Sequence, residues 1–130
     1  MKLGIIGAAQ SGKSTIFSAL TGARGENENK GAKKDNRIAS VKVMDERIDF
    51  LSNMYKPKKT TYASVEYLLP SDVGSGSESM IWSQARVCDA LIHVVRNFPD
   101  FSGTAPSSEN DYRRLEDEMI LNDLVVVEKR

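Results

Sequence analysis

The chain has 130 residues, the size of one compact domain, which excludes two full domains. Hydrophobic residues make up 40% of it and charged residues 28%, a composition typical of globular proteins rather than disordered or membrane-spanning ones. The 18 basic residues balance 18 acidic ones, so the chain as a whole does not attract nucleic acid, and a role in binding it would require a local basic patch.

The first predicted elements are a strand, a glycine-rich loop and a helix. Residues 2–6 form a short apolar run that ends at Gly7, which is typical of a strand. Four apolar residues then recur at helical spacing: Ile16, Phe17, Ala19 and Leu20. Gly22 is expected to end this helix in the left-handed conformation, and the polar segment 23–37 that follows is expected to be a mobile loop.

The next segment predicts a half-buried strand and a short helix. Residues 38–43 place their side chains alternately on two faces, which is the period of such a strand. Asp45 is a suitable cap for a following helix, which we expect to end at Lys56 because the residue before Pro57 is pushed out of helical geometry. Three apolar residues of this helix are expected to face the core: Ile48, Leu51 and Met54.

The second half of the chain repeats the alternation of strands and helices. Residues 60–69 predict a third strand, 71–79 a flexible loop and 80–87 a short helix. The continuous apolar run 90–95 is typical of a strand that is covered on both faces, and we expect it to be central in the sheet.

A last helix is predicted after the loop at residues 97–107. Ser108, with Asp111 three residues later, is a typical helix start, and the helix is expected to continue to the last residue. Its apolar face would consist of Leu115, Met119, Leu121, Leu124 and Val125. Strands that alternate with helices indicate an α/β fold with a mainly parallel sheet.

One motif carries chemistry. The residues from Gly7 to Ser14 fit the phosphate-binding loop pattern, in which two glycines precede Lys and Ser between a strand and a helix. Backbone N–H groups of such a loop face phosphate oxygens, with Lys13 on the β and γ phosphates and the hydroxyl of Ser14 on Mg²⁺. We therefore predict a nucleotide-phosphate site made by Ala9, Gln10, Ser11, Gly12, Lys13, Ser14 and Thr15, with Ser14 as the metal ligand.

Beyond this loop, the sequence resembles the YchF and Obg-like ATPase family of P-loop GTPases. The similar stretches are residues 3–7, 12–21, 43–49, 56–60, 88–98 and 115–130, of which 88–98 is the most specific. The resemblance implies a Ras-like G domain, an α/β core with a mainly parallel sheet and flanking helices, of which residues 1–130 would be a part that is truncated at the C-terminus. It also implies binding of ATP or GTP with Mg²⁺ as cofactor, and a link to the ribosome or to translation.

The chain departs from the family at both switch loops. After its third strand the family has an Asp-x-x-Gly motif, whose Asp supports Mg²⁺ and whose Gly senses the γ phosphate, but this chain has Leu69, Pro70, Ser71 and Asp72. Asp72 could substitute from a shifted position. Lys33 lies near the position of a metal-binding Thr in the first switch. These departures imply hydrolysis that is slow or absent, and we assign no catalytic residue.

Three hypotheses about function follow. The leading one is an ATP- or GTP-hydrolysing protein of the YchF type, and the second is a non-hydrolysing nucleotide-binding or regulatory module with degenerate switch loops. The third, a structural fragment with a vestigial loop, would bind no nucleotide. The family's base-recognition motif would lie beyond residue 130, so no residue of this chain indicates a preference for ATP or GTP.

Two surfaces and two single residues complete the predictions. Seven basic residues could form a surface for ribosomal RNA, although the acidic and amide side chains among them favour a solvated loop: Lys30, Lys33, Lys34, Arg37, Lys56, Lys58 and Lys59. No further strand is visible to pair beside residues 90–95, so we expect an open sheet edge that could support a homodimer. His93, inside this apolar run, is expected to be a packed residue rather than a catalyst, and Cys88 a small buried one.

The compartment is predicted from what the sequence lacks. No segment approaches the roughly 20 apolar residues of a membrane-spanning helix, and the apolar run at residues 3–9 is too short for a signal peptide. Cys88 is the single cysteine, which excludes an internal disulfide bond. We therefore expect a cytoplasmic protein without a membrane partner.

Overall fold

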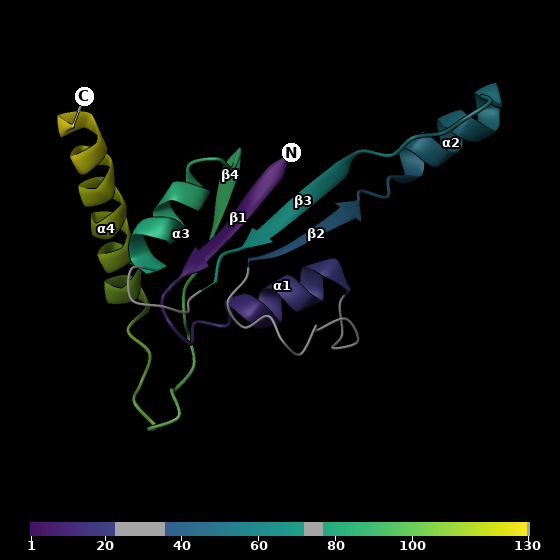
Figure 1. Cartoon of the computed structure of the whole chain (residues 1–130). Coiled ribbons are helices and arrows are strands. Elements are labelled where there is room, and N and C mark those ends of the chain that lie inside the picture. The colour runs from purple at the N-terminus through teal and green to yellow at the C-terminus, as the bar shows by residue number, and fades with distance from the viewer. Residues whose placement is uncertain (23–35, 72–76, 130) are drawn as a thin grey trace.

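A computed structural model describes residues 1–22, 36–71 and 77–129 of the chain. The elements follow one another as β1 (Lys2–Gly7), α1 (Lys13–Thr21), β2 (Arg37–Lys42), α2 (Glu46–Tyr55), β3 (Ser64–Leu69), α3 (Ser77–Ala85), β4 (Ala90–Val94) and α4 (Ser108–Glu128). The four strands form one sheet in the order β2-β3-β1-β4 (Figure 1). β1 is parallel to both β3 and β4, whereas β2 is antiparallel to β3. The predicted α/β fold with a mainly parallel sheet is confirmed.

Each face of the sheet carries its own small core. On one face Phe17 of α1 packs with Ile5, Leu69 and Val94, which come from three neighbouring strands. On the other face Ile6 packs against α3 and α4 through Trp82, Ala85 and Leu115. Helices therefore cover both faces (Figure 1), and the alternation of Ile5 and Ile6 along β1 sends one side chain into each core.

Local sequence signals set several helix ends where they were expected. Gly22 ends α1 with a φ of 67°, the left-handed conformation that glycine adopts without strain. Asp45 caps α2, since its side chain accepts a hydrogen bond from the Arg47 N–H at 2.9 Å. At the other end of α2, Lys56 is left-handed with a φ of 45°, and its N–H donates to the Ser52 carbonyl.

The prediction that α2 turns its apolar residues toward a core is wrong. The side chains of Leu51 and Met54 are 51% and 56% exposed, and Ile48 is half-buried. The helix lies beyond the end of the sheet (Figure 1), where no apolar layer is available to cover it. Its inward side is polar instead: Ser52 and Thr60 share a hydrogen bond of 2.6 Å, and Tyr62 donates one to Asp49.

Several element bounds also differ from the prediction. β3 begins at Ser64 rather than at residue 60, because residues 60–63 connect α2 to the sheet. α3 begins at Ser77 rather than at residue 80. α4 begins at Ser108 as expected and ends at Glu128 rather than at the last residue. Ser107 makes no side-chain cap hydrogen bond, and the hydroxyl of Ser108 donates to the Arg96 carbonyl at 2.8 Å. The loops predicted at 23–37 and 71–79 lie largely outside the described residues.

The outer parts of β4 and α4 are more open than the sequence pattern indicated. β4 lies at one edge of the sheet rather than at its centre, and Leu91 is 39% exposed, so the strand is not covered on both faces. Of the predicted apolar face of α4, Leu115 and Met119 contact the core. The other three members, Leu121, Leu124 and Val125, are exposed. Among the helices of the described segments, none combines the length and the apolar character needed to span a membrane.

Candidate functional site

The site is built on the sharp turn between β1 and α1. Gly7 has a φ of 156°, and a Cβ atom there would lie 2.4 Å from the Val94 carbonyl oxygen. Only glycine fits this close approach of the loop to β4. Gln10 and Gly12 also have positive φ angles, 60° and 98°, so the backbone is left-handed at two further positions before α1 begins.

Lys13 is the first residue of α1 and lies across this loop. It is 7% exposed, and its ammonium group donates to the carbonyl oxygens of Gly7 at 2.9 Å and Ala8 at 2.8 Å. These hydrogen bonds hold the cation at the N-terminal end of α1, where the helix dipole also favours an anion. The Lys13 charge and the N–H groups of the first helical turn, which have no acceptor within the helix, are thus directed to one place.

Ser11 lies inside the loop, whereas the two following hydroxyl residues face outward. Ser11 is 4% exposed, and among the described residues its hydroxyl oxygen has no hydrogen-bond partner. A buried hydroxyl without a partner is destabilising, by about 1–3 kcal/mol. Ser14 and Thr15 are exposed in the first turn of α1 and can reach a ligand from solvent.

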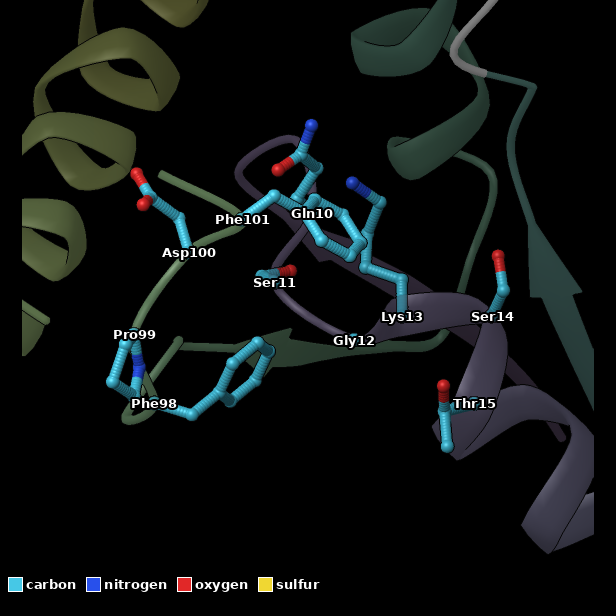
Figure 2. Close-up of a pocket in the computed structure, with 10 residues that line it drawn as sticks. All are labelled: Gln10, Ser11, Gly12, Lys13, Ser14, Thr15, Phe98, Pro99, Asp100 and Phe101. Carbon is cyan, nitrogen blue, oxygen red and sulfur yellow. The ribbon is translucent and has the colours of Figure 1, made fainter. Parts of the chain in front are cut away.

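A pocket of about 440 Å³ opens over this loop. Figure 2 shows its two sides, one from the β1–α1 loop and the first turn of α1, the other from the loop that follows β4. The lining residues are Gln10, Ser11, Gly12, Lys13, Ser14, Thr15, Phe98, Pro99, Asp100 and Phe101. Six of the seven predicted phosphate-site residues therefore meet in one pocket, and Ala9 lies in the same loop outside the lining.

The side of the pocket that follows β4 was not among the predicted site residues. Residues 97–107 were expected to form a loop, and four of them line the pocket: Phe98, Pro99, Asp100 and Phe101. A signal was available, because β4 pairs in parallel with β1 and the loops at the carboxyl ends of neighbouring parallel strands meet at one edge of the sheet. That signal requires the strand order, which the sequence alone did not supply.

The residues compared with the family's second switch lie in the core. Leu69, which the resemblance aligned with the family's Asp, is 5% exposed and packs with Phe17 and Ile5. Pro70 is buried as well, and the N–H of Ser71 donates to the side chain of Asn36 at 3.1 Å. Asp72 and Lys33, the other two residues considered at the switch loops, lie outside the described residues.

The contacts of His93 and Cys88 indicate roles in packing rather than in catalysis. The His93 ring stacks on Tyr112 of α4 with 5.2 Å between ring centroids and 19° between planes, which confirms the prediction of a packed residue. Burial lowers the pKa of His93, and the charge of Glu116 opposes that shift. Cys88 is half-buried and donates a weak hydrogen bond to the Gln84 carbonyl at 3.4 Å; burial raises the pKa of its thiol, so it is a poor nucleophile.

The chain is similar in sequence to proteins that are named as ATPases, although no protein-family model matches it. It is 34% identical over 138 residues to the ribosome-binding ATPase YchF of Bacillus subtilis, an alignment that covers 98% of this chain and 38% of that protein. It is also 34% identical over 134 residues to Obg-like ATPase 1 of Caenorhabditis elegans, covering 95% of the chain and 33% of that protein.

A solved structure supports the same relationship. The structure of the Schizosaccharomyces pombe YchF GTPase superposes on the chain with a TM-score of 0.67 at 30% identity, over 99% of this chain and 37% of that one. The chain thus spans about a third of the length of the relatives it matches. Over the third of those proteins that it spans, the chain belongs to the YchF and Obg-like ATPase family of P-loop GTPases.

Proposed function

We propose that residues 1–130 form part of a P-loop nucleotide-binding domain that holds the phosphates of ATP or GTP. The observation that carries this proposal is the position of Lys13, whose ammonium lies against the glycine loop at the N-terminal end of α1 and lines the pocket. Backbone N–H groups of the loop and of the first turn of α1 would bind phosphate oxygens, because the first N–H groups of a helix have no acceptor within the helix itself. Thr15 would contact the α phosphate.

The residues present fit Mg²⁺ only in combination with the nucleotide. No group of three His, Cys, Asp or Glu side chains in the described part of the chain could hold a metal ion. Mg²⁺ prefers oxygen ligands and keeps several waters, so the exposed hydroxyl of Ser14 and the phosphates themselves would hold it. When bound, Mg²⁺ would neutralise part of the phosphate charge. Lys13 would supply the other nearby positive charge.

Hydrolysis is expected to be weak. The resemblance aligns Leu69 with the family's switch Asp, and Leu69 packs in the core, so its side chain offers no oxygen to a metal or a water molecule. The leading hypothesis remains an ATPase or GTPase, since relatives carry those names. The alternative is a regulatory module that binds nucleotide without turnover.

A titration with fluorescent ATP and GTP analogues tests the proposed binding. We expect the wild-type chain to bind in the presence of Mg²⁺ and the Lys13→Ala variant to lose binding, because the buried cation that faces the phosphates is gone. Lys42→Ala is a matched control, since Lys42 is an exposed lysine of β2 away from the pocket. Thermal melting of each variant verifies folding. Equal affinity of wild type and Lys13→Ala contradicts the proposal, and no binding to wild type supports the vestigial loop.

Phosphate release then separates the two nucleotide-binding hypotheses. Release that depends on Lys13 supports an enzyme, whereas retained binding without release supports the regulatory module. Comparing ATP with GTP in the same assay gives the nucleotide preference.

A ribosome contact is the second part of the proposal. A relative is named as ribosome-binding. In this chain Lys56, Lys58 and Lys59 are exposed beyond the C-terminal end of α2, next to Tyr55, which is 74% exposed. Lysines can bind RNA phosphates and an exposed ring can stack on a base. Co-sedimentation with ribosomes should decrease when Lys56, Lys58 and Lys59 are all replaced by Glu. The control variant Lys42→Glu should co-sediment as much as wild type. Equal co-sedimentation of wild type and the triple variant contradicts this contact.

A further inference from the structure

The loop that follows β4 closes on itself through one carboxylate. Oδ1 of Asp100 accepts three hydrogen bonds, from the N–H of Ser102 at 2.9 Å, its hydroxyl at 2.6 Å and the N–H of Thr104 at 2.9 Å. The backbone adds a second set, from Gly103 N–H to the Asp100 carbonyl at 3.0 Å and from Asp100 N–H to the Thr104 carbonyl at 3.2 Å. Residues 100–104 therefore form a closed turn around this side chain.

The second oxygen of the same carboxylate faces a cation at the start of the loop. Oδ2 lies 3.5 Å from Nη1 of Arg96, and the two side chains are only 26% and 16% exposed. The hydrogen bonds from Ser102 and Thr104, with Arg96 nearby, lower the pKa of Asp100 to about 2. The carboxylate is therefore ionised throughout the neutral pH range.

The loop is also attached to α4. The hydroxyl of Ser108, in the first turn of α4, donates to the Arg96 carbonyl at 2.8 Å and lies 3.4 Å from the side-chain oxygen of Asn97. Arg96 is thus held at its backbone by α4 and at its guanidinium by Asp100. Both ends of the segment that carries the pocket side chains are fixed.

The side chains that this turn carries have little packing of their own. Phe98 is 49% exposed, and its ring lies 4.0 Å from the position a Cβ atom would take on Gly12. Phe101 is 97% exposed although it lines the pocket. Since so little of Phe101 is packed, its position depends on the backbone that carries it. In Figure 2 the Asp100 carboxylate points away from Lys13, so its contacts serve the loop rather than a cation in the site.

We propose that Asp100 is a positioning residue, which holds Phe98 and Phe101 in place for the ligand of the pocket by closing the turn at residues 100–104. This inference rests on the proposed nucleotide binding. A loop that is ordered before the ligand arrives does not lose conformational entropy on binding, so the preformed turn raises affinity. Asp100 lines the pocket, but its carboxylate is turned toward the loop, so we place its effect in the turn.

The test compares two substitutions of Asp100 with a matched one elsewhere. Asp100→Ala removes the acceptor and should raise the Kd for a fluorescent nucleotide about tenfold, whereas Asp100→Asn keeps an oxygen for Ser102 and Thr104 and should restore most of the affinity. Asp123→Ala is the control, because Asp123 also pairs with an arginine, Arg86 at 3.0 Å, but outside the pocket. All titrations are made at a temperature at which melting curves show each variant fully folded.

A double-mutant cycle separates positioning from general stability. If Asp100 acts through the aromatic side chains, Asp100→Ala should have little further effect on Kd once Phe98 and Phe101 are both alanine. Additive effects, or equal Kd values for wild type and Asp100→Ala, overturn the inference. Failure of wild type to bind nucleotide instead overturns the proposed function on which it rests, so the two failures are distinguishable.

Discussion

At the scale of single residues, the loop between β1 and α1 owes its shape to glycine and lysine at fixed positions. Gly7 allows the loop to touch β4, and Lys13 crosses the loop to the carbonyl groups of Gly7 and Ala8. The Lys13 contacts span at most six residues of sequence, so the loop to which they belong could be predicted from the motif, whereas the approach of Gly7 to β4 could not. Phe98 and Phe101 were not predicted, because only the pairing of β4 with β1 brings their loop next to the β1–α1 loop.

Gly7→Ala should destabilise the fold more than Gly22→Ala. Both glycines have positive φ angles, but a Cβ atom on Gly7 would lie 2.4 Å from the Val94 carbonyl oxygen, whereas nothing lies within 4 Å of one on Gly22. We expect a loss of about 1 kcal/mol for Gly22→Ala from backbone strain alone, and about 3 kcal/mol for Gly7→Ala with the added overlap. Urea denaturation measures both free energies of unfolding, and equal losses contradict the close approach of the loop to β4.

At the scale of elements, the sequence predicted those with strong local signals and failed where packing decides. Asp45 and Pro57 bracket α2 as expected, because a cap and a proline act on adjacent backbone. The prediction that Leu51 and Met54 face a core was wrong, because an apolar pattern shows which side chains share a helix face but not whether other apolar residues cover that face. The same limit explains why the apolar run of β4 was placed at the centre of the sheet, whereas it lies at an edge.

The contact between β4 and α4 should make stability depend on pH. Burial against Tyr112 lowers the pKa of His93 below its ordinary value of 6.5, with Glu116 opposing, so the unfolded chain binds a proton more readily than the folded one. The stabilisation that comes from burying neutral His93 is therefore fully present above the pKa of the unfolded chain, and it decreases as the pH falls below about 6.5. Denaturation of wild type and His93→Phe between pH 8 and pH 5 tests it: the decrease should be smaller in the variant, and equal slopes contradict it.

At the scale of the whole molecule, a four-stranded sheet carries helices on both faces and a pocket at the carboxyl ends of β1 and β4. The pocket requires both β1 and β4, whose parallel pairing brings two loops from opposite parts of the chain together. The chain spans about a third of the length of its relatives. The fold class followed from the alternation of elements, while the composition of the pocket required the three-dimensional arrangement.

The predicted homodimer would form through β4, which lies at one edge of the sheet. An edge strand presents unpaired backbone N–H and C=O groups to a second chain. Ala90 begins this strand and is exposed, so Ala90→Lys should oppose pairing without disturbing the core. Light scattering at high concentration should give a dimer for wild type and a monomer for the variant. A monomeric wild type contradicts the prediction.

The central claim is that the β1–α1 loop holds nucleotide phosphates, and an NMR titration of the ¹⁵N-labelled chain with Mg·ATP and Mg·GTP tests it most directly. We predict that the amide signals of residues 10–15 shift with added nucleotide and that those of residues 98–101 follow, since both segments line the pocket. Signals at the end of α2, residues 55–59, should stay unchanged as an internal control. Unchanged signals at residues 10–15 at saturating nucleotide, or shifts confined to another surface, would contradict the account.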